Sequence, residues 1–304
     1  MKNLFSTTGL LAVFAAAPVL AQDNLEIIGQ PIDGKMGFQP AVTELASDIH
    51  ALDHLLLIII TLITVLVTGL LIWCIVRFNQ KRNPVAASFT HHTPVEVLWT
   101  IVPIVILVFI GAFSLPILFK QQEIPEADIT IKATGNQWYW SYEYVDHGFG
   151  FDSYLIGSTA TLDTDARPED ANVTAYVLDE NMEAKLAEYG YTRDQWLLAT
   201  DTALVIPVNK TIVVQATGAD VIHAWAVPAF GVKQDAVPGR LAQLWFKAEK
   251  EGIYFGQCSE LCGKDHAYMP ITVKVVSEDA YKQWLDGAID EYAGTPRNLT
   301  VASN

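Results

Sequence analysis

Two long apolar segments constrain the fold of this chain more than any other feature. Leu55–Trp73 carries no charged residue over nineteen positions, and Val97–Phe119 carries none over twenty-three. A helix that crosses the hydrocarbon core of a bilayer needs about 20 apolar residues. Either segment alone could be a buried core helix, but two in tandem favour a membrane. The sequence therefore predicts a hairpin of two transmembrane helices over residues 51–120, at about 51–77 and 95–119.

The first residues of the chain have the pattern of a secretory signal peptide. Lys2 supplies a basic n-region, Leu10–Ala17 is an apolar core, and residues 19–21 offer a cleavage site of small residues. The apolar core is too short to form a third membrane span. We therefore expect residues 1–21 to be removed, and residues 22–50 to form a periplasmic N-terminal segment.

The connection between the two apolar segments indicates how the hairpin is oriented. It holds Arg77, Lys81 and Arg82, and no acidic residue before Glu96. Because short cytoplasmic loops are enriched in Lys and Arg, this connection is expected in the cytoplasm. Both ends of the mature chain would then lie in the periplasm, in a multi-pass protein of a bacterial inner membrane.

Residues 121–304 have a different character from the hairpin. They hold 27 acidic and 13 basic residues, so their formal charge is −14. Short β-rich runs separated by turn residues predict an antiparallel sandwich or barrel. Ser277 can cap a C-terminal helix over 277–294, with two acids in its first turn. The polar, acidic stretch 148–202 is predicted to be mainly a solvated surface insertion, with a short helix at Asn181–Tyr189.

The run from Cys258 to Met269 concentrates metal-binding chemistry. It contains two thiols, Cys258 and Cys262, together with His266 and the thioether of Met269, and His223 lies upstream. Soft thiolate and thioether ligands with imidazole select copper, whereas zinc sites take Cys, His and carboxylate. Two thiolates are one more than a mononuclear blue-copper site uses, which allows both sulfurs to bridge two copper ions. The alternative is a disulfide between the two cysteines, with the methionine and histidines as ordinary core residues.

A second dense run, of aromatic residues, lies within Gly135–Tyr144. Trp138, Tyr139, Trp140, Tyr142 and Tyr144 are five aromatic residues in seven positions. One strand face cannot use them all, because alternate side chains point to opposite faces. One set is expected to pack in the core, while the other is exposed and suggests a docking surface. The alternative is a sandwich core with an aromatic belt at the membrane interface.

The metal-ligand run and the aromatic run together resemble subunit II of the haem–copper cytochrome c oxidases, of the bacterial aa3 type. The resemblance covers nearly the whole mature chain. It implies a cupredoxin-like Greek-key barrel over residues 121–304, added to the helical hairpin. It also implies a dinuclear copper-A centre within this barrel.

The resemblance implies how the two copper ions would be shared among the ligands. Six residues would hold them: His223, Cys258, Glu260, Cys262, His266 and Met269. The two cysteines would bridge both metals. His223 and Met269 would complete one copper, while His266 and the backbone carbonyl of Glu260 would complete the other. The Glu260 side chain would help to bind a magnesium ion at the interface with subunit I.

The resemblance also assigns roles outside the metal centre. Trp138 would receive the electron from cytochrome c. Glu96 would lie at the mouth of a proton path that continues into subunit I, although an acid beside Pro94 also suits a helix N-terminus on electrostatic grounds alone. Five acids are candidates for docking a basic cytochrome c: Glu143, Asp152, Glu188, Asp201 and Asp220. Among these, a solvated surface role is the better interpretation for Glu188, and Asp201 is a weaker candidate.

The implied function is that of an electron-transfer subunit in a proton-translocating terminal oxidase. The chain would accept electrons from cytochrome c and pass them to haem, which is bound only by subunit I, where oxygen is reduced. The sequence has no C-x-x-C-H motif, so the cytochrome c donor is a separate chain. Partners would be cytochrome c, subunit I, further oxidase subunits and the membrane, with no nucleic acid. The alternative is the copper-A subunit of a related haem–copper nitric-oxide reductase, which only the partner subunit would distinguish.

Overall fold

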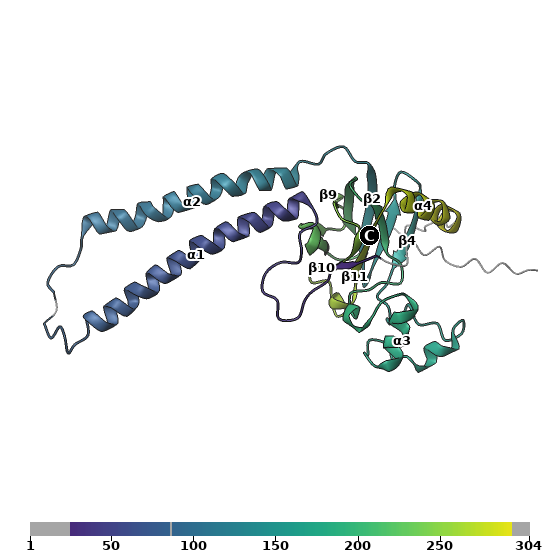
Figure 1. The fold of residues 1–304 in the computed structure, drawn as a ribbon, viewed down its shortest axis with the longest axis horizontal. Coiled ribbons are helices and arrows are strands. Elements are labelled where there is room, and N and C mark those ends of the chain that lie inside the picture. The colour runs from purple at the N-terminus through teal and green to yellow at the C-terminus, as the bar shows by residue number, and fades with distance from the viewer. Residues whose placement is uncertain (1–24, 86, 294–304) are drawn as a thin grey trace, which may run out of the picture.

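The computed structural model describes residues 25–85 and 87–293. The expected signal peptide, residues 1–21, lies outside these described residues. A long two-helix hairpin joins a β-rich domain at one end (Figure 1). The hairpin consists of α1 (Glu44–Arg77) and α2 (Thr93–Gln122), both long and apolar enough to cross a membrane.

The start of α1 and the end of α2 contact each other, and the end of α2 contacts the β domain. The N-cap residue Thr43 accepts a hydrogen bond from the backbone of Ala46, so α1 begins at Glu44, earlier than the predicted start near residue 51. Lys120 of α2 lies 2.6 Å from Glu44 and 2.7 Å from Asp48, and these ion pairs join the two helices. The Lys120 carbonyl accepts a hydrogen bond from the Trp245 indole at 3.1 Å, which ties α2 to the β domain.

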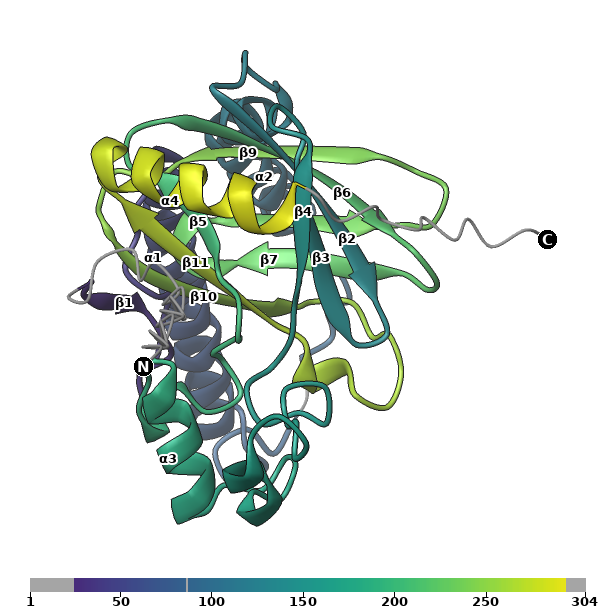
Figure 2. The same cartoon turned by 90° about the vertical axis from the view of Figure 1, so that its right-hand side faces the viewer.

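The β domain consists of two packed sheets. One sheet has the strand order β5-β11-β10-β7-β8, with β1 added beside β10, and the other has the order β4-β3-β2-β6-β9. The strands are β1 (Ile27–Gly29), β2 (Ile129–Asn136), β3 (Tyr139–Tyr144), β4 (Phe149–Ser153), β5 (Leu204–Pro207), β6 (Thr211–Gly218), β7 (His223–Val227), β8 (Val232–Ala236), β9 (Ala242–Lys247), β10 (Gly252–Cys258) and β11 (Pro270–Val276). Helix α4 (Glu278–Tyr292) lies across the sheets, with Ser277 as its N-cap (Figure 2). The predicted fold class, a transmembrane hairpin with an all-β barrel domain, is confirmed.

The strand pairing differs from the antiparallel arrangement predicted from the sequence. β2 pairs with β6, β5 with β11, and β1 with β10, and all three of these pairs are parallel. Parallel neighbours require a long crossover connection, and each of these pairs is separated by many residues. Strands β2 and β6, for example, are separated by β3, β4, the acidic insertion and β5.

Alternation along β3 divides the aromatic run between two faces. Trp140, Tyr142 and Tyr144 are fully buried in the core between the sheets. Tyr139 is half-buried on the opposite face, and Trp138, which precedes β3, is half-buried and packs against the margin of the core. The predicted core set is therefore confirmed, but along β3 only Tyr139 of the aromatic run faces outward, because the pleat places alternate residues on opposite faces.

The stretch 148–202 is more compact than the predicted solvated loop. It begins with β4, and residues 154–200, which we name the acidic lobe, contain helix α3 (Glu180–Glu188). Met182 and Leu186 of α3 are fully buried. Lys185 and Asp170 are also buried and form an ion pair at 2.6 Å. The lobe is therefore packed rather than solvated, and it lies beside β1 and away from α4 (Figure 2).

Candidate metal centre

The predicted metal ligands lie where neighbouring strands end. His223 is the first residue of β7 and Cys258 is the last residue of β10. These strands are antiparallel neighbours, with Cys258 opposite Trp225, so both residues reach the same edge of the sheet. Residues 259–269, which we name the metal loop, connect β10 to β11 and carry the remaining candidates.

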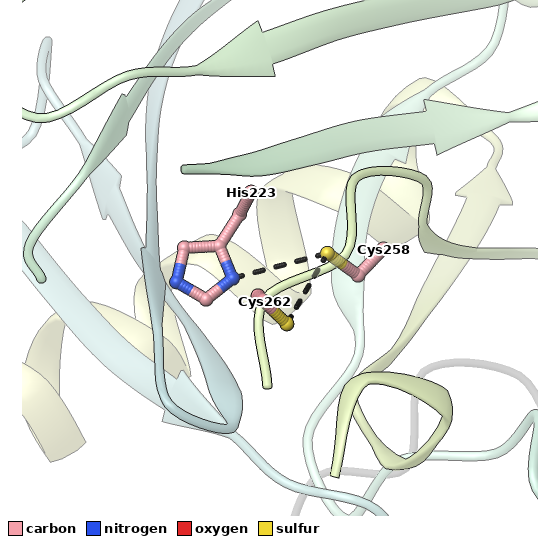
Figure 3. Close-up of side chains that lie close together, drawn as sticks. All are labelled: His223, Cys258 and Cys262. Carbon is pink, nitrogen blue, oxygen red and sulfur yellow. Dashed lines mark hydrogen bonds between the residues drawn. The ribbon is translucent and has the colours of Figure 1, made fainter. Parts of the chain in front are cut away.

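His223, Cys258 and Cys262 point toward one another at this edge (Figure 3). His223 Nδ1 lies 3.8 Å from the Cys258 sulfur, which in turn lies 3.8 Å from the Cys262 sulfur. Their ligand atoms all lie within 4.8 Å of one another, and all three residues are buried. Both cysteines are free thiols, so the structure does not contain the alternative disulfide.

Further donor atoms surround the two sulfurs. The Cys262 sulfur lies 3.5 Å from His266 Nδ1 and 3.5 Å from the Met269 sulfur. The Glu260 carbonyl oxygen lies 3.3 Å from the Cys258 sulfur, while the Glu260 side chain is exposed. Two donors bound at about 2.0–2.3 Å to one tetrahedral metal are about 3.5 Å apart. The structure thus places a donor atom of each of the other four predicted ligands within 3.8 Å of one of the two sulfurs.

The two thiols differ in their readiness to ionise. Burial raises the pKa of Cys258, but hydrogen bonds from His223 and from the loop backbone outweigh burial and lower this pKa to about 7. Burial and the neighbouring Cys258 sulfur raise the pKa of Cys262 to about 12. Since thiolates are the metal-binding form, a soft cation would have to displace the Cys262 proton, and binding would release protons.

Asp220 fixes the orientation of the His223 ring. Its carboxylate lies 2.8 Å from His223 Nε2 and accepts hydrogen bonds from the backbone N–H of Val221 at 2.7 Å and of Gln137 at 2.8 Å. Partial burial opposes ionisation, but these contacts lower the pKa of the Asp220 carboxyl. A carboxylate on the far nitrogen leaves Nδ1 directed at the sulfurs, as in many metal sites. The sequence indicates Asp220 only as a docking acid, although its i, i+3 spacing to His223 is a signal for this contact.

A close approach of the backbone also confines His223. A Cβ atom on Gly135 would lie 2.7 Å from the His223 ring, so only glycine fits at this position. Gly135 lies in β2, immediately before the turn that carries Trp138. The aromatic run and the metal ligands are therefore packed against each other from adjacent elements.

Trp138 lies against the metal loop. Its indole N–H donates to the Cys262 carbonyl at 3.2 Å, and the Gln137 amide donates to the same oxygen at 2.9 Å. The ammonium of Lys264 lies 5.3 Å from the Trp138 ring centroid. The indole of Trp138 is therefore partly exposed to solvent and is hydrogen-bonded to the backbone of Cys262, a predicted ligand.

Two of the predicted docking acids lie together on neighbouring strands. Glu143 of β3 is 3.7 Å from Lys132 of β2, its cross-strand neighbour. Asp152 of β4 is exposed and accepts a hydrogen bond from Ser141 at 2.5 Å. Both acids lie on the outer face of this sheet, where Lys132 offsets the charge of Glu143 and Asp152 is the exposed acid.

Of the remaining three docking acids, Asp201 and Glu188 have partners within the fold, as Asp220 does. Asp201 accepts hydrogen bonds from the backbone N–H of Tyr154 at 2.8 Å and of Thr202 at 2.7 Å. Burial raises the pKa of Asp201 to about 6. Glu188 lies 3.1 Å from Lys185 in the acidic lobe. These contacts favour structural roles for both residues.

Glu96 lies near the start of α2, and that end of the hairpin lies away from the β domain (Figure 1). It is in the first turn of α2, and its carboxylate accepts a hydrogen bond from the backbone N–H of His92 at 3.0 Å. This contact satisfies one of the free N–H groups at the helix start. The structure therefore does not bring Glu96 together with the predicted ligands.

Comparisons with known proteins cover both parts of the chain. The family model described as the periplasmic domain of cytochrome c oxidase subunit II matches residues 129–187 and 166–276, and the model of its transmembrane domain matches residues 31–117. The chain is 63% identical over 281 residues to cytochrome c oxidase subunit 2 of Cereibacter sphaeroides, covering 92% of this chain and 88% of that protein. It is 41% identical over 255 residues to the corresponding subunit of Cyanidium caldarium, covering 84% and 91% of the two chains. A solved periplasmic domain of subunit II from Bradyrhizobium japonicum is 48% identical, with a TM-score of 0.42, and covers 56% of this chain and 99% of that domain.

Proposed function

Because the chain belongs to the subunit II family of the cytochrome c oxidases, which are haem–copper terminal oxidases, we propose that it is the subunit through which electrons enter the complex. In this proposal it accepts electrons from cytochrome c at a dinuclear copper-A centre and passes them to haem in subunit I. The observation that carries the proposal is the pair of free thiols 3.8 Å apart, surrounded by imidazole and thioether donors. The alternative nitric-oxide reductase subunit is not favoured, since the matched relatives are cytochrome c oxidase subunits.

The donor set supports copper over other metals. Two thiolates, two imidazoles, a thioether and a carbonyl are soft or intermediate ligands, and a thioether is typical of copper sites that transfer electrons. When bound, two coppers bridged by the two cysteines would share one electron and spread its charge over the centre. The coordination of one copper ion would be completed by His223 and Met269. The coordination of the other would be completed by His266 and the Glu260 carbonyl.

The residues around the proposed centre suit electron transfer without bond making. Cys258, Cys262 and Met269 are 5%, 3% and 1% exposed, so little water reaches the sulfurs. Asp220 holds the His223 ring in one orientation. Trp138 offers a half-buried aromatic ring, hydrogen-bonded to the backbone of Cys262, on which an electron from cytochrome c could arrive.

The proposal extends to partners and location. The chain is a membrane protein with two helices able to span the bilayer, and its family associates with other oxidase subunits. We place it in a bacterial inner membrane, with the β domain in the periplasm, because the basic residues lie in the connection between the helices. The exposed Asp152 and the partly exposed Asp220, whose carboxylate bonds the backbone of Gln137 beside Trp138, would attract a basic cytochrome c. The Glu260 side chain would help to bind a magnesium ion at the interface with subunit I. Glu96 would lie at the entrance of a proton path that continues into subunit I.

Stopped-flow mixing of the purified oxidase with reduced cytochrome c tests this proposal. In the wild type, the copper absorption should change before the haem of subunit I is reduced. Cys262→Ser should abolish rapid electron acceptance, because only one thiolate remains to bridge the metals. A Cys262→Ser complex that oxidises cytochrome c at the wild-type rate would refute the proposed route.

A further inference from the structure

The acidic lobe packs against the strand that leads into the metal loop. β10 ends at Cys258, where the metal loop begins. Ile253 and Phe255 of β10 share a buried apolar cluster with residues of the lobe: Ile156, Leu186, Tyr191 and Ala199. The ring of Tyr191 meets that of Phe255 edge-on, at 6.2 Å between centroids. One end of the metal loop is therefore held by the lobe.

The lobe is also bonded to the strand that leaves the metal loop. Thr272 of β11 is fully buried, three residues after Met269. Its hydroxyl donates to the Leu198 carbonyl at 3.2 Å and accepts from the Thr200 N–H at 3.1 Å. Because Leu198 and Thr200 belong to the lobe, the other end of the loop is tied to the same unit.

A third contact reaches the middle of the metal loop itself. The ring of Tyr176, in the lobe, lies 5.0 Å from the ring of Tyr268 at an interplanar angle of 60°. Tyr268 belongs to the short turn His266–Tyr268, next to Met269. Tyr176 has a left-handed backbone, with φ of 61°, and its N–H donates to the Gly157 carbonyl at 3.0 Å. A non-glycine residue keeps such a conformation only where its surroundings hold it.

The interior of the lobe makes it stiff enough to act as a support. The buried ammonium of Lys185 pairs with Asp170 at 2.6 Å, and the Asp170 carboxylate also accepts from the Asp163 N–H at 2.9 Å. The guanidinium of Arg167 lies 3.4 Å from the same carboxylate. A buried ion pair with these additional partners links segments of the lobe that are distant in sequence.

We propose that the acidic lobe braces the metal loop, with Tyr176 and Thr272 as positioning residues that hold His266 and Met269 near their metal-binding positions before a metal arrives. A loop held at both ends and in its middle loses less conformational freedom when it binds a ligand. The bound metal should then dissociate more slowly. This inference rests on the proposed function only in taking the loop as a copper site.

Hydrogen–deuterium exchange of the full chain without metal tests the brace independently of copper. Tyr176→Ala removes the ring contact, and Thr272→Val removes both hydrogen bonds to the lobe. In each variant, amides of residues 259–269 are expected to exchange about fivefold faster, in line with the contribution of one aromatic pair or hydrogen bond. Tyr176→Phe keeps the ring and should match the wild type, as should the neighbouring exposed control Val177→Ala. Amides of α3 report whether the lobe stays folded in each variant, and Thr272→Val replaces a residue of β11 and none of the lobe.

The copper-loaded chain provides the second measurement. The rate at which a chelator removes copper should rise about fivefold in Tyr176→Ala and Thr272→Val, and stay unchanged in Tyr176→Phe and Val177→Ala. Wild-type rates of exchange and of copper loss in both Tyr176→Ala and Thr272→Val would overturn the brace. A wild-type chain that takes up no copper would instead refute the proposed function, while the exchange measurement would still decide the brace.

Discussion

Replacing Asp220 separates two roles of one carboxylate, the orientation of His223 and the attraction of cytochrome c. The carboxylate contacts His223 Nε2 at 2.8 Å and two backbone N–H groups, of Val221 and Gln137. Asp220→Ala removes all three contacts, whereas Asp220→Asn removes the charge and keeps one acceptor oxygen. The two variants should therefore differ in metal binding and agree in charge.

The magnitude follows from the contacts that are lost. A hydrogen bond to a charged group contributes about 1.5–3 kcal/mol, and removal of the partner of a metal-binding histidine typically lowers metal affinity about 10- to 100-fold. We expect Asp220→Ala to weaken copper binding by about this factor. Asp220→Asn should weaken it less, because the carboxamide oxygen can still accept a hydrogen bond from His223.

Two assays on the same variants distinguish the roles. Competition with a copper chelator gives the affinity, and cytochrome c oxidation at rising salt gives the electrostatic attraction. Both variants should show a flatter salt dependence, since each removes one negative charge from the acidic surface. Asp152→Asn is the matched control, because it removes an exposed charge on β4 that does not contact His223. Wild-type copper affinity in Asp220→Ala would refute the positioning role.

Four further predictions concern other parts of the chain. Trp138→Gln should leave the apparent KM for cytochrome c near normal but greatly slow copper reduction at saturating donor; a change in KM alone, seen by stopped flow, would make Trp138 only a contact residue. Because burial raises the pKa of Asp201 to about 6, the folded chain binds this proton more tightly than the unfolded chain, so stability should fall as pH rises from about 4 to 6. Asp201→Asn should remove that fall, as thermal denaturation at several pH values would reveal. Lys185→Met removes the nearest cation from the buried Asp170 carboxylate and leaves it only Arg167, at 3.4 Å, so it should destabilise the lobe by about 3 kcal/mol, measured as faster hydrogen exchange in α3; an unchanged α3 would exclude a structural role for the Lys185–Asp170 pair. Glu96→Gln should leave copper reduction intact and slow proton-coupled turnover; normal turnover of the oxidase would leave Glu96 as a helix-capping residue.

The hairpin and the metal loop were predictable because each depends on a local pattern. An uncharged apolar segment as long as Leu55–Trp73 forms few structures other than a membrane-spanning helix. The start of α1 at Glu44 was not predictable from hydropathy, since Glu44 and Asp48 are charged. They are helical because Thr43 caps the helix and Lys120 of α2 pairs with both acids.

The packed interior of the acidic lobe could not be predicted from the sequence, because its charged residues are buried only by forming an ion pair with each other. Asp170 and Lys185 appear solvated in a sequence, yet both are buried once they meet. The contacts of Tyr176 with Tyr268, and of Thr272 with residues 198 and 200, join positions far apart along the chain. Such long-range contacts leave no periodic signal, so only the folded structure shows them.

The most direct measurement counts the copper ions in the purified full chain and records their electron paramagnetic resonance spectrum. The account predicts two copper ions per chain, with one unpaired electron shared between both. Two copper ions are expected because Cys258 and Cys262 supply two thiolates that can bridge a pair of metals, with further donors beside each sulfur. One copper per chain with a four-line spectrum, or zinc at full occupancy, would contradict the account.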